Sequence, residues 1–254
     1  MPQNIKYNLK RLVFLVSDAT FGRVIRIFQK SLAIPKVNTI SVLDLLKNYG
    51  VQSSAEFAIN EMQNAMVFTT REDLWKHVIS TLPASITQNR IEYSLEFGVY
   101  KGDSLNKLAS ISPKTEWTGF DSFEGLQEDW PGTAFTKDFF SVEGKLPKVG
   151  KNVELVKGWI EDTLPKFLKR YQNRQVSIVH MDVDTFKPTS YILESLYENG
   201  CFGPGTTLIF DEYFGYSHSW KLNEHKAFND FVDKYGVKYQ YIAHTNQAVA
   251  VRLN

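Results

Sequence analysis

The sequence contains very little cysteine. Cys201 is the single cysteine among 254 residues, which excludes an internal disulfide framework and a zinc cluster of several thiolates. We interpret Cys201 as a small buried apolar side chain rather than a nucleophile. The fold must therefore rest on a hydrophobic core, and a hydrophobic content of 43% with 22% charged residues is ordinary for a globular protein.

Long apolar runs, repeats and an excess of one charge are also missing. No apolar run approaches the length that spans a bilayer, and the N-terminus lacks a signal-peptide cleavage pattern. The net charge of +1 provides no global field that would attract nucleic acid. We therefore expect a cytoplasmic protein with no transmembrane segment and no nucleic-acid partner, built as one large α/β domain or two small ones.

Residues 1–90 are predicted to form a helical N-terminal extension, or cap. Helical periodicity predicts helices at 42–49, at 54–66 with Ser54 as its cap, and at 72–82. Within residues 1–30, six lysines and arginines stand against one acid, which gives this arm a net charge of +5. Such an arm can lie on a membrane or pair with a partner subunit in a homo-oligomer, although a solvated face of a packed helix is the favoured interpretation.

Residues 91–254 are organised around two short apolar runs that read as buried strands. Each run is followed by two acids: Asp182 and Asp184 after residues 176–181, and Asp211 and Glu212 after residues 206–210. The helical pattern between the runs ends at Asn199-Gly200, which predicts a strand–helix–strand unit with parallel strands. Both acidic pairs then lie on the rim where open α/β sheets bind ligands.

Four carboxylates on one rim indicate either a site for a hard divalent cation or a general base. Each acid could instead be structural, and Asp184 before Thr185 fits the N-cap of the following helix. A structural role for all four is harder to explain, because the two pairs stand at equivalent strand ends.

A glycine-bearing turn follows the predicted strand at 91–98. Strand, glycine turn and helix in this order let a ligand approach the backbone and the helix N-terminus closely. The spacing of Gly98 and Gly102 matches neither the dinucleotide fingerprint nor the P-loop. The next predicted strand, 116–120, ends at Asp121, where an acid can accept hydrogen bonds from both hydroxyls of a ribose. The alternative is a plain turn residue.

A long connection with little periodicity, residues 122–152, is predicted to act as a lid. It carries the aromatic residues Phe123, Trp130, Phe135, Phe139 and Phe140. After a third strand at 153–156, Trp159 and Ile160 could enclose an adenine. The last strands, 238–242 and 248–252, are too close in sequence for a helical crossover and must form an antiparallel hairpin.

These features resemble the class I S-adenosylmethionine-dependent methyltransferases, and within them the macrocin/mycinamicin sugar O-methyltransferases. The segments that carry the resemblance are LEFGVYKGDS, TGFDSFEGL, VKGWIEDTLP, HMDVDTFKPT and FDEY. It covers residues 91–254 and implies an α/β Rossmann-like sheet of seven strands, with helices on both faces and an antiparallel final hairpin. It also implies an O-methyltransferase that acts on a hydroxyl of a sugar or a glycosylated small molecule.

The resemblance further implies a set of site residues. The methyl donor S-adenosylmethionine would contact Glu96, Gly98, Gly102, Ser104, Asp121, Ser122, Phe123, Trp159 and Ile160, with Ser104 near its carboxylate. Asp182, Asp211 and Glu212 would hold Mg²⁺, and Asp182 or Asp184 would take the proton. The family more often has Asp where Glu212 stands, and has Asp-Gly-Asp where this chain has Asp182-Val183-Asp184.

Two other functions are compatible with parts of the pattern. A nicotinamide-dependent oxidoreductase shares the ribose acid but needs a closer glycine spacing. A non-catalytic protein on a methyltransferase scaffold would use the basic arm and the aromatic lid to bind a partner.

Overall fold

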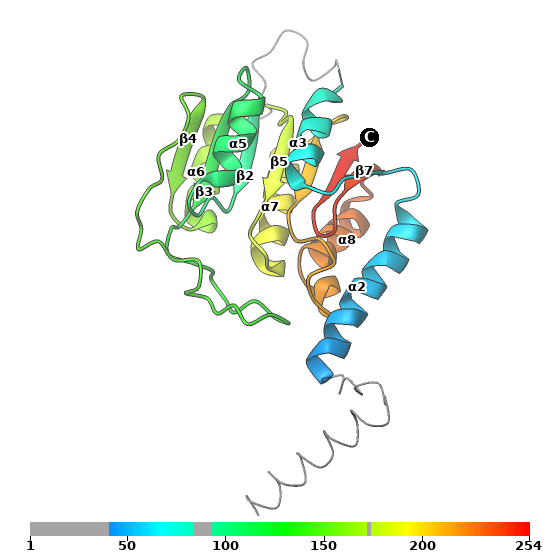
Figure 1. Cartoon of the computed structure of the whole chain (residues 1–254). Helices are drawn as coiled ribbons and strands as arrows, with labels where there is room; N and C mark the ends of the chain where they lie inside the picture. Colours follow the sequence, from blue (N-terminus) through cyan, green and yellow to red (C-terminus); the bar gives the residue numbers. More distant parts are fainter. Residues whose placement is uncertain (1–40, 84–92, 172–173) are drawn as a thin grey trace, which may run out of the picture. The chain divides into compact units, whose positions relative to one another are not determined.

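The computed structural model contains a central sheet of eight strands, shown in Figure 1. It describes residues 41–83, 93–171 and 174–254, and residues 43–254 form one compact unit. The strand order across the sheet is β1 (Met66–Val67), β7 (Tyr239–His244), β8 (Val249–Leu253), β6 (Thr207–Phe210), β5 (Ile178–Met181), β2 (Tyr93–Phe97), β3 (Glu116–Asp121) and β4 (Val153–Lys157). The basic arm in residues 1–30 and the start of the strand predicted at 91–98 lie outside the described residues.

The direction of the strands agrees with the prediction. Strand β8 runs antiparallel to both of its neighbours, β6 and β7, while every other neighbouring pair is parallel. The seven predicted strands and the antiparallel final hairpin are therefore confirmed. The eighth strand, β1, pairs with β7 through only two residues, which is too short to leave a periodic pattern in the sequence.

Helices cover both faces of the sheet (Figure 1). On one face α3 (Arg71–Ser80) and α5 (Asp103–Ile111) bury Leu74, Trp75 and Leu105. On the other face lie α6 (Ile160–Tyr171), α7 (Phe186–Glu198) and α8 (Glu224–Tyr235). Because neighbouring residues of a strand point to opposite faces, buried strands such as β5 contribute side chains to the hydrophobic cores on both faces of the sheet.

The first described helix, α2 (Val42–Glu61), corrects one prediction. The prediction of two helices, with Ser54 as the cap of the second, is wrong. Helix α2 is continuous, and Ser54 lies in its middle. A Cβ at Gly50 would come within 2.6 Å of the carbonyl carbon of Ser217. Gly50 therefore marks a close contact with the loop after β6 and not a helix end. The Ser54 hydroxyl donates to the Gly50 carbonyl at 2.7 Å and accepts the Gly215 N–H at 2.9 Å.

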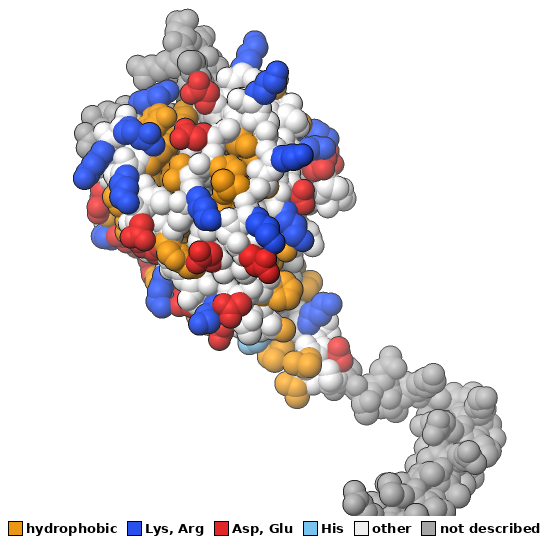
Figure 2. Space-filling view, turned by 90° about the vertical axis from the view of Figure 1, so that its left-hand side faces the viewer, with side chains coloured by type: hydrophobic (Ala, Val, Ile, Leu, Met, Phe, Trp, Pro, Cys, Tyr) orange, Lys and Arg blue, Asp and Glu red, His pale blue; other side chains and the backbone are white. Residues whose placement is uncertain are grey.

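Strand β1 and helix α3 belong to the same compact unit as the sheet although they precede residue 91. The division of the chain at residue 90 stays a prediction. None of the described helices is both long enough and apolar enough to cross a membrane. On the face shown in Figure 2, basic and acidic side chains are interspersed, and hydrophobic side chains gather near the start of α2, where Val42, Leu43 and Leu45 are exposed.

Candidate functional site

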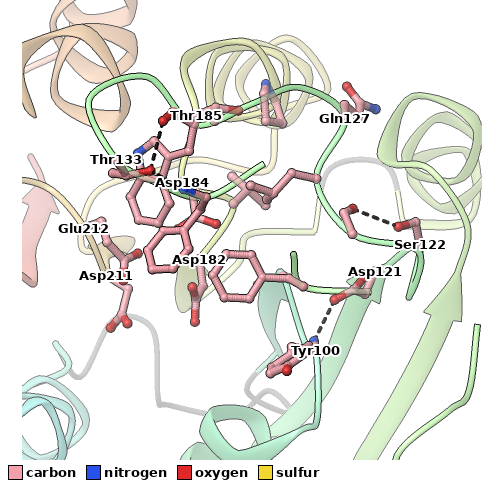
Figure 3. A pocket seen from close by; sticks show the side chains of 18 of the residues that line it. Tyr100, Asp121, Ser122, Gln127, Thr133, Asp182, Asp184, Thr185, Asp211 and Glu212 are labelled. Atoms are coloured by element: carbon pink, nitrogen blue, oxygen red, sulfur yellow. Dashed lines mark hydrogen bonds between the residues drawn. The ribbon is translucent and has the colours of Figure 1, made fainter. Parts of the chain in front are cut away.

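A cavity of about 600 Å³ opens at the carboxyl ends of strands β2 to β6. Its lining falls into two parts, which Figure 3 shows on opposite sides. The Asp121 side consists of Gly98, Tyr100, Asp121, Ser122, Trp159 and Ile160. The acidic side consists of Asp182, Asp184, Asp211 and Glu212. Aromatic rings of Trp130, Phe135, Phe140 and Tyr216 complete the wall.

The turn after β2 requires glycine at position 98. Gly98 has φ +89°, and a Cβ there would lie 1.8 Å from the carbonyl oxygen of Asp182. A side chain would thus be strained and would collide with the backbone that follows β5. The turn and the first acid of the acidic side are therefore packed against each other, which brings the two sides of the cavity together.

Asp121 ties this turn to the next one. Its Oδ2 atom accepts the N–H groups of Val99 and Tyr100 at 2.8 and 2.6 Å, and its Oδ1 atom accepts the N–H of Phe123 at 2.6 Å. A carboxylate has about four lone-pair sites, so acceptor capacity remains for a ligand hydroxyl. Asp121 is at once a turn residue and a cavity residue, and the two interpretations drawn from sequence are compatible.

The predicted donor residues do not all reach the cavity. Gly98, Asp121, Ser122, Trp159 and Ile160 line it, whereas Glu96, Gly102, Ser104 and Phe123 do not. Gly102 is the N-cap of α5, and Ser104 is 93% buried in the first turn of that helix. Phe123 is fully buried in the core beside α5. Glu96 lies within β2, where its side chain is also fully buried.

On the acidic side, three carboxylates converge. Oxygens of Asp182, Asp184 and Glu212 lie within 4.8 Å of one another. Burial and the neighbouring carboxylates raise the pKa of Asp182 and Glu212 well above their ordinary values, and raise the pKa of Asp184 to about 7. Crowded buried carboxylates repel one another, and a bound cation relieves that repulsion.

Asp211 stands apart from this group because it already has cationic partners. Its Oδ2 atom forms an ion pair with Arg71 Nη1 at 2.6 Å, and its Oδ1 atom lies 3.5 Å from His180 Nε2. Burial acts to raise the pKa of Asp211, but His180 and Arg71 outweigh it and hold that pKa below its ordinary value. Asp211 is thus kept as an anion.

His180 continues the chain of charges beneath the cavity. It is fully buried, and its Nδ1 atom lies 2.9 Å from Glu96 Oε1. Burial acts to lower the pKa of His180, but the interactions with Asp211 and Glu96 raise it to about 10. The order Arg71, Asp211, His180, Glu96 alternates in charge, so each buried ion has an opposite neighbour.

The arrangement fits a hard divalent cation. Glu212 Oε2 is buried without a hydrogen-bond partner among the described residues. Oxygen-only donor sets of this kind suit Mg²⁺ better than softer metals. Behind them the fully buried Glu224 accepts the Glu212 N–H at 3.1 Å, which holds the backbone that carries Glu212.

The long segment 122–152 contributes an aromatic wall. Phe135 packs against Trp130, Phe139 and Phe140, with ring centroids 4.5 to 5.6 Å apart. Two hydroxyls hold the segment in place, because Ser217 donates to the Gly132 carbonyl at 2.8 Å and Ser219 to the Pro131 carbonyl at 2.9 Å. These contacts place the aromatic residues over the rim.

Sequence reasoning missed Arg71 and Glu224. Arg71 lines the cavity yet lies 140 residues before its partner Asp211, in a region read only as a helical cap. Glu224 is one acid among many at a helix start, where an acid is common. Nothing in the local sequence distinguishes either residue, since its role depends on what the fold brings beside it.

Residues 144–252 match the sequence model of the macrocin O-methyltransferase (TylF) family. Together with the fold, this match supports a class I S-adenosylmethionine-dependent O-methyltransferase. The matched residues include the acidic side of the cavity and the final hairpin, while the Asp121 side precedes them except for Trp159 and Ile160. No curated protein matches this sequence significantly.

Solved structures with this fold include the calicheamicin methyltransferase CalS11. It aligns with 18% identity and a TM-score of 0.56, over 89% of this chain and 90% of that one. The apo structure of CalS11, described as a TDP-rhamnose 3′-O-methyltransferase, aligns with 19% identity, a TM-score of 0.48 and coverage of 89% and 92%. A Podospora anserina methyltransferase bound to S-adenosylhomocysteine aligns with 14% identity, a TM-score of 0.40 and coverage of 80% and 96%.

Proposed function

We propose that this methyltransferase acts on a hydroxyl of a sugar or a glycosylated small molecule with the help of Mg²⁺. The observation that carries the proposal is the convergence of Asp182, Asp184 and Glu212 in the cavity that also contains Asp121. The macrocin O-methyltransferase match and the likeness in fold to CalS11 support a sugar-containing acceptor. The likeness in fold alone would not select one.

The Asp121 side would hold the donor. Asp121 would accept hydrogen bonds from the ribose hydroxyls, while Trp159 and Ile160 would enclose the adenine and the turn at Gly98 would approach the methionine part. Methyl transfer from a sulfonium is an in-line displacement, so orientation of the two reactants lowers the barrier. The aromatic wall would exclude water from this geometry.

The acidic side would hold Mg²⁺ and move the proton. Asp182 and Glu212 belong both to the predicted ligand set and to the group of converging carboxylates. Asp184 converges with them in the structure, whereas Asp211, the third predicted ligand, is paired with Arg71. A divalent cation here would lower the pKa of neighbouring acceptor hydroxyls. Asp182 or Asp184, the acids that follow β5, would take the proton of the acceptor hydroxyl.

The first experiment is calorimetric titration with S-adenosylhomocysteine, with and without magnesium. Methyl transfer to a panel of methyl glycosides, aryl glycosides and catechols then tests the acceptor. Binding of S-adenosylhomocysteine, with transfer to a glycoside that a chelator abolishes, is the expected result. Transfer to catechol but to none of the glycosides would reject the sugar acceptor, and full activity in chelator would reject the magnesium role.

The remaining proposal concerns assembly. The exposed apolar residues at the start of α2 are compatible with a homo-oligomer formed through the N-terminal helices. Sedimentation analysis of the full chain beside a variant carrying Leu43→Ser and Leu45→Ser would test it, because loss of the larger species is expected only in the variant.

A further inference from the structure

Arg71 holds an unusual position in the charge distribution of the cavity. Among the described residues that line the cavity, it is the only cation, while five carboxylates line it: Asp121, Asp182, Asp184, Asp211 and Glu212. Its side chain retains 47% of its exposure, so the guanidinium is open to the cavity. Arg71 is therefore the cationic side chain that an anionic group of a ligand would meet in the described part of this cavity.

The guanidinium is held firmly but keeps free capacity. Arg71 Nη1 bonds Asp211 Oδ2 at 2.6 Å, and the guanidinium carbon lies 5.2 Å from the centre of the Trp75 ring. A guanidinium carries five N–H donors in a planar fork that matches a carboxylate in two-point contact. The contact with Asp211 is the hydrogen bond that the structure shows for this side chain within the described residues, which leaves donors for a second carboxylate.

The start of α3 contacts α5, which comes after the glycine-bearing turn. Glu72, next to Arg71, forms an ion pair of 2.9 Å with Lys107 of α5, the helix that follows this turn. Along the rim the strand ends follow the order β4, β3, β2, β5 and β6. Trp159 and Ile160 follow β4, Asp121 ends β3, and Asp211 follows β6 with Arg71 beside it.

This order places the ends of the donor. If the adenine lies at β4 and the ribose at β3, the amino-acid end of the donor reaches β2 and β5, next to Arg71. That end carries a carboxylate that must be bound among five carboxylates of the protein. Ser104, the residue expected near this carboxylate, is buried in α5 and does not line the cavity.

We infer that Arg71 binds the carboxylate of the donor's methionine moiety while it keeps its ion pair with Asp211. The inference rests on the proposed donor orientation. One guanidinium bridging two carboxylates would connect the donor directly to the acidic side. Arg71 would then be a donor-binding residue contributed by a part of the chain outside the family match at residues 144–252.

The test compares two ligands that differ in the amino acid. S-adenosylhomocysteine carries the carboxylate, whereas 5′-methylthioadenosine has the same adenosine and sulfur but no amino acid. Affinities are measured by calorimetry in chelator for the wild type, Arg71→Gln and Arg71→Lys. Lys107→Gln is the matched control, because it removes a neighbouring cation that does not line the cavity.

We expect Arg71→Gln to lower the affinity for S-adenosylhomocysteine about 10- to 100-fold, which is the usual effect of losing a charge-assisted hydrogen bond. Affinity for 5′-methylthioadenosine should stay within about twofold, and Arg71→Lys should fall between the wild type and Arg71→Gln. Lys107→Gln should bind both ligands as the wild type does. Melting curves show whether each variant is folded. If Arg71→Gln is not folded, Arg71→Lys is compared with the wild type in its place.

Three results would overturn the inference. Equal losses for both ligands would show that Arg71 acts only through the structure of the site. Unchanged affinity for S-adenosylhomocysteine in Arg71→Gln would place the carboxylate elsewhere. A wild type that binds neither ligand would defeat the proposed donor site itself, and this outcome differs from the other two because it needs no variant.

Discussion

Both sides of the cavity carry carboxylates at strand ends, but the two sides stabilise those carboxylates differently. On the Asp121 side a single acid accepts three backbone N–H groups and is stabilised by the turns that it joins. On the acidic side, Asp182, Asp184 and Glu212 crowd together, and burial together with mutual repulsion raises their pKa values. The first arrangement is complete within the protein, whereas the second is stable only with protons or a cation.

This difference predicts that donor binding depends on the Asp121 side and that the chemical step depends on the acidic side. A carboxylate with its full set of donors is a fixed acceptor, suited to hold a ligand hydroxyl without changing charge. Carboxylates whose pKa is raised by burial and mutual repulsion exchange a proton for a cation readily, which suits proton transfer and cation binding. Variants on the two sides should therefore fail in different assays.

The largest effect is expected from Asp184→Asn. Removal of a general base lowers kcat by about 100- to 10,000-fold, whereas affinity for S-adenosylhomocysteine should remain within about threefold because Asp184 lies on the acidic side. Initial-rate kinetics and calorimetry measure the two quantities, with the exposed Asp233→Asn as control. An equal loss of binding would remove the functional separation of the two sides.

Asp121→Asn should produce the converse defect. The amide keeps one acceptor oxygen and turns the other into a donor that faces backbone N–H groups, so we expect S-adenosylhomocysteine affinity to fall about 10- to 100-fold. The melting temperature should also fall because two turns lose their common acceptor. The same titration on Asp138→Asn, an exposed acid of segment 122–152, provides the comparison, and unaltered affinity in Asp121→Asn would contradict the donor site.

Magnesium affinity distinguishes the members of the acidic side from one another. We expect Asp184→Asn to lower the affinity for magnesium about tenfold more than Asp211→Asn does. The charge of Asp211 is already balanced by Arg71 and His180. Calorimetric titration with magnesium chloride gives both constants, and melting curves show that the variants are folded. The opposite ranking would favour Asp182, Asp211 and Glu212, the set implied by the family resemblance.

The smallest effect concerns the aromatic packing behind the acidic side. Burial lowers the pKa of His225 to about 4, so the unfolded chain gains a proton below pH 6.5 that the folded protein does not bind. Stability should therefore be full above about pH 7 and decrease as the pH falls towards 4, by about 2 to 3 kcal/mol. His225→Phe should lack this component, which urea unfolding at several pH values would show. Parallel pH profiles of wild type and variant would exclude it.

The sequence predicted the sheet well because buried parallel strands leave continuous β-branched and aromatic runs. The runs before Asp182 and Asp211 were identified in full, and the final hairpin followed from a connection too short for a helical crossover. The continuity of α2 was missed because Gly50 normally signals a break, and only the neighbouring Ser217 backbone explains its presence. Strand β1 was missed because two residues carry no periodicity.

Within the site, residues at strand ends were predictable and those that arrive from other elements were not. The positions of Asp121, Asp182 and Glu212 followed from the rule that parallel strands share one rim. The position of Phe123 in the core did not follow, because its φ of +62° turns the chain in a way that the sequence does not announce.

By itself the sequence determined the order of strands and helices, the rim on which the acids gather and the absence of disulfide support, since these depend on local patterning and composition. The tertiary structure alone decided which carboxylates converge and which one is paired with cationic side chains. Arg71 approaches Asp211 across 140 residues, and Asp182 is packed against Gly98 from another strand. Charge interactions depend on distance and burial, and only the folded chain sets both.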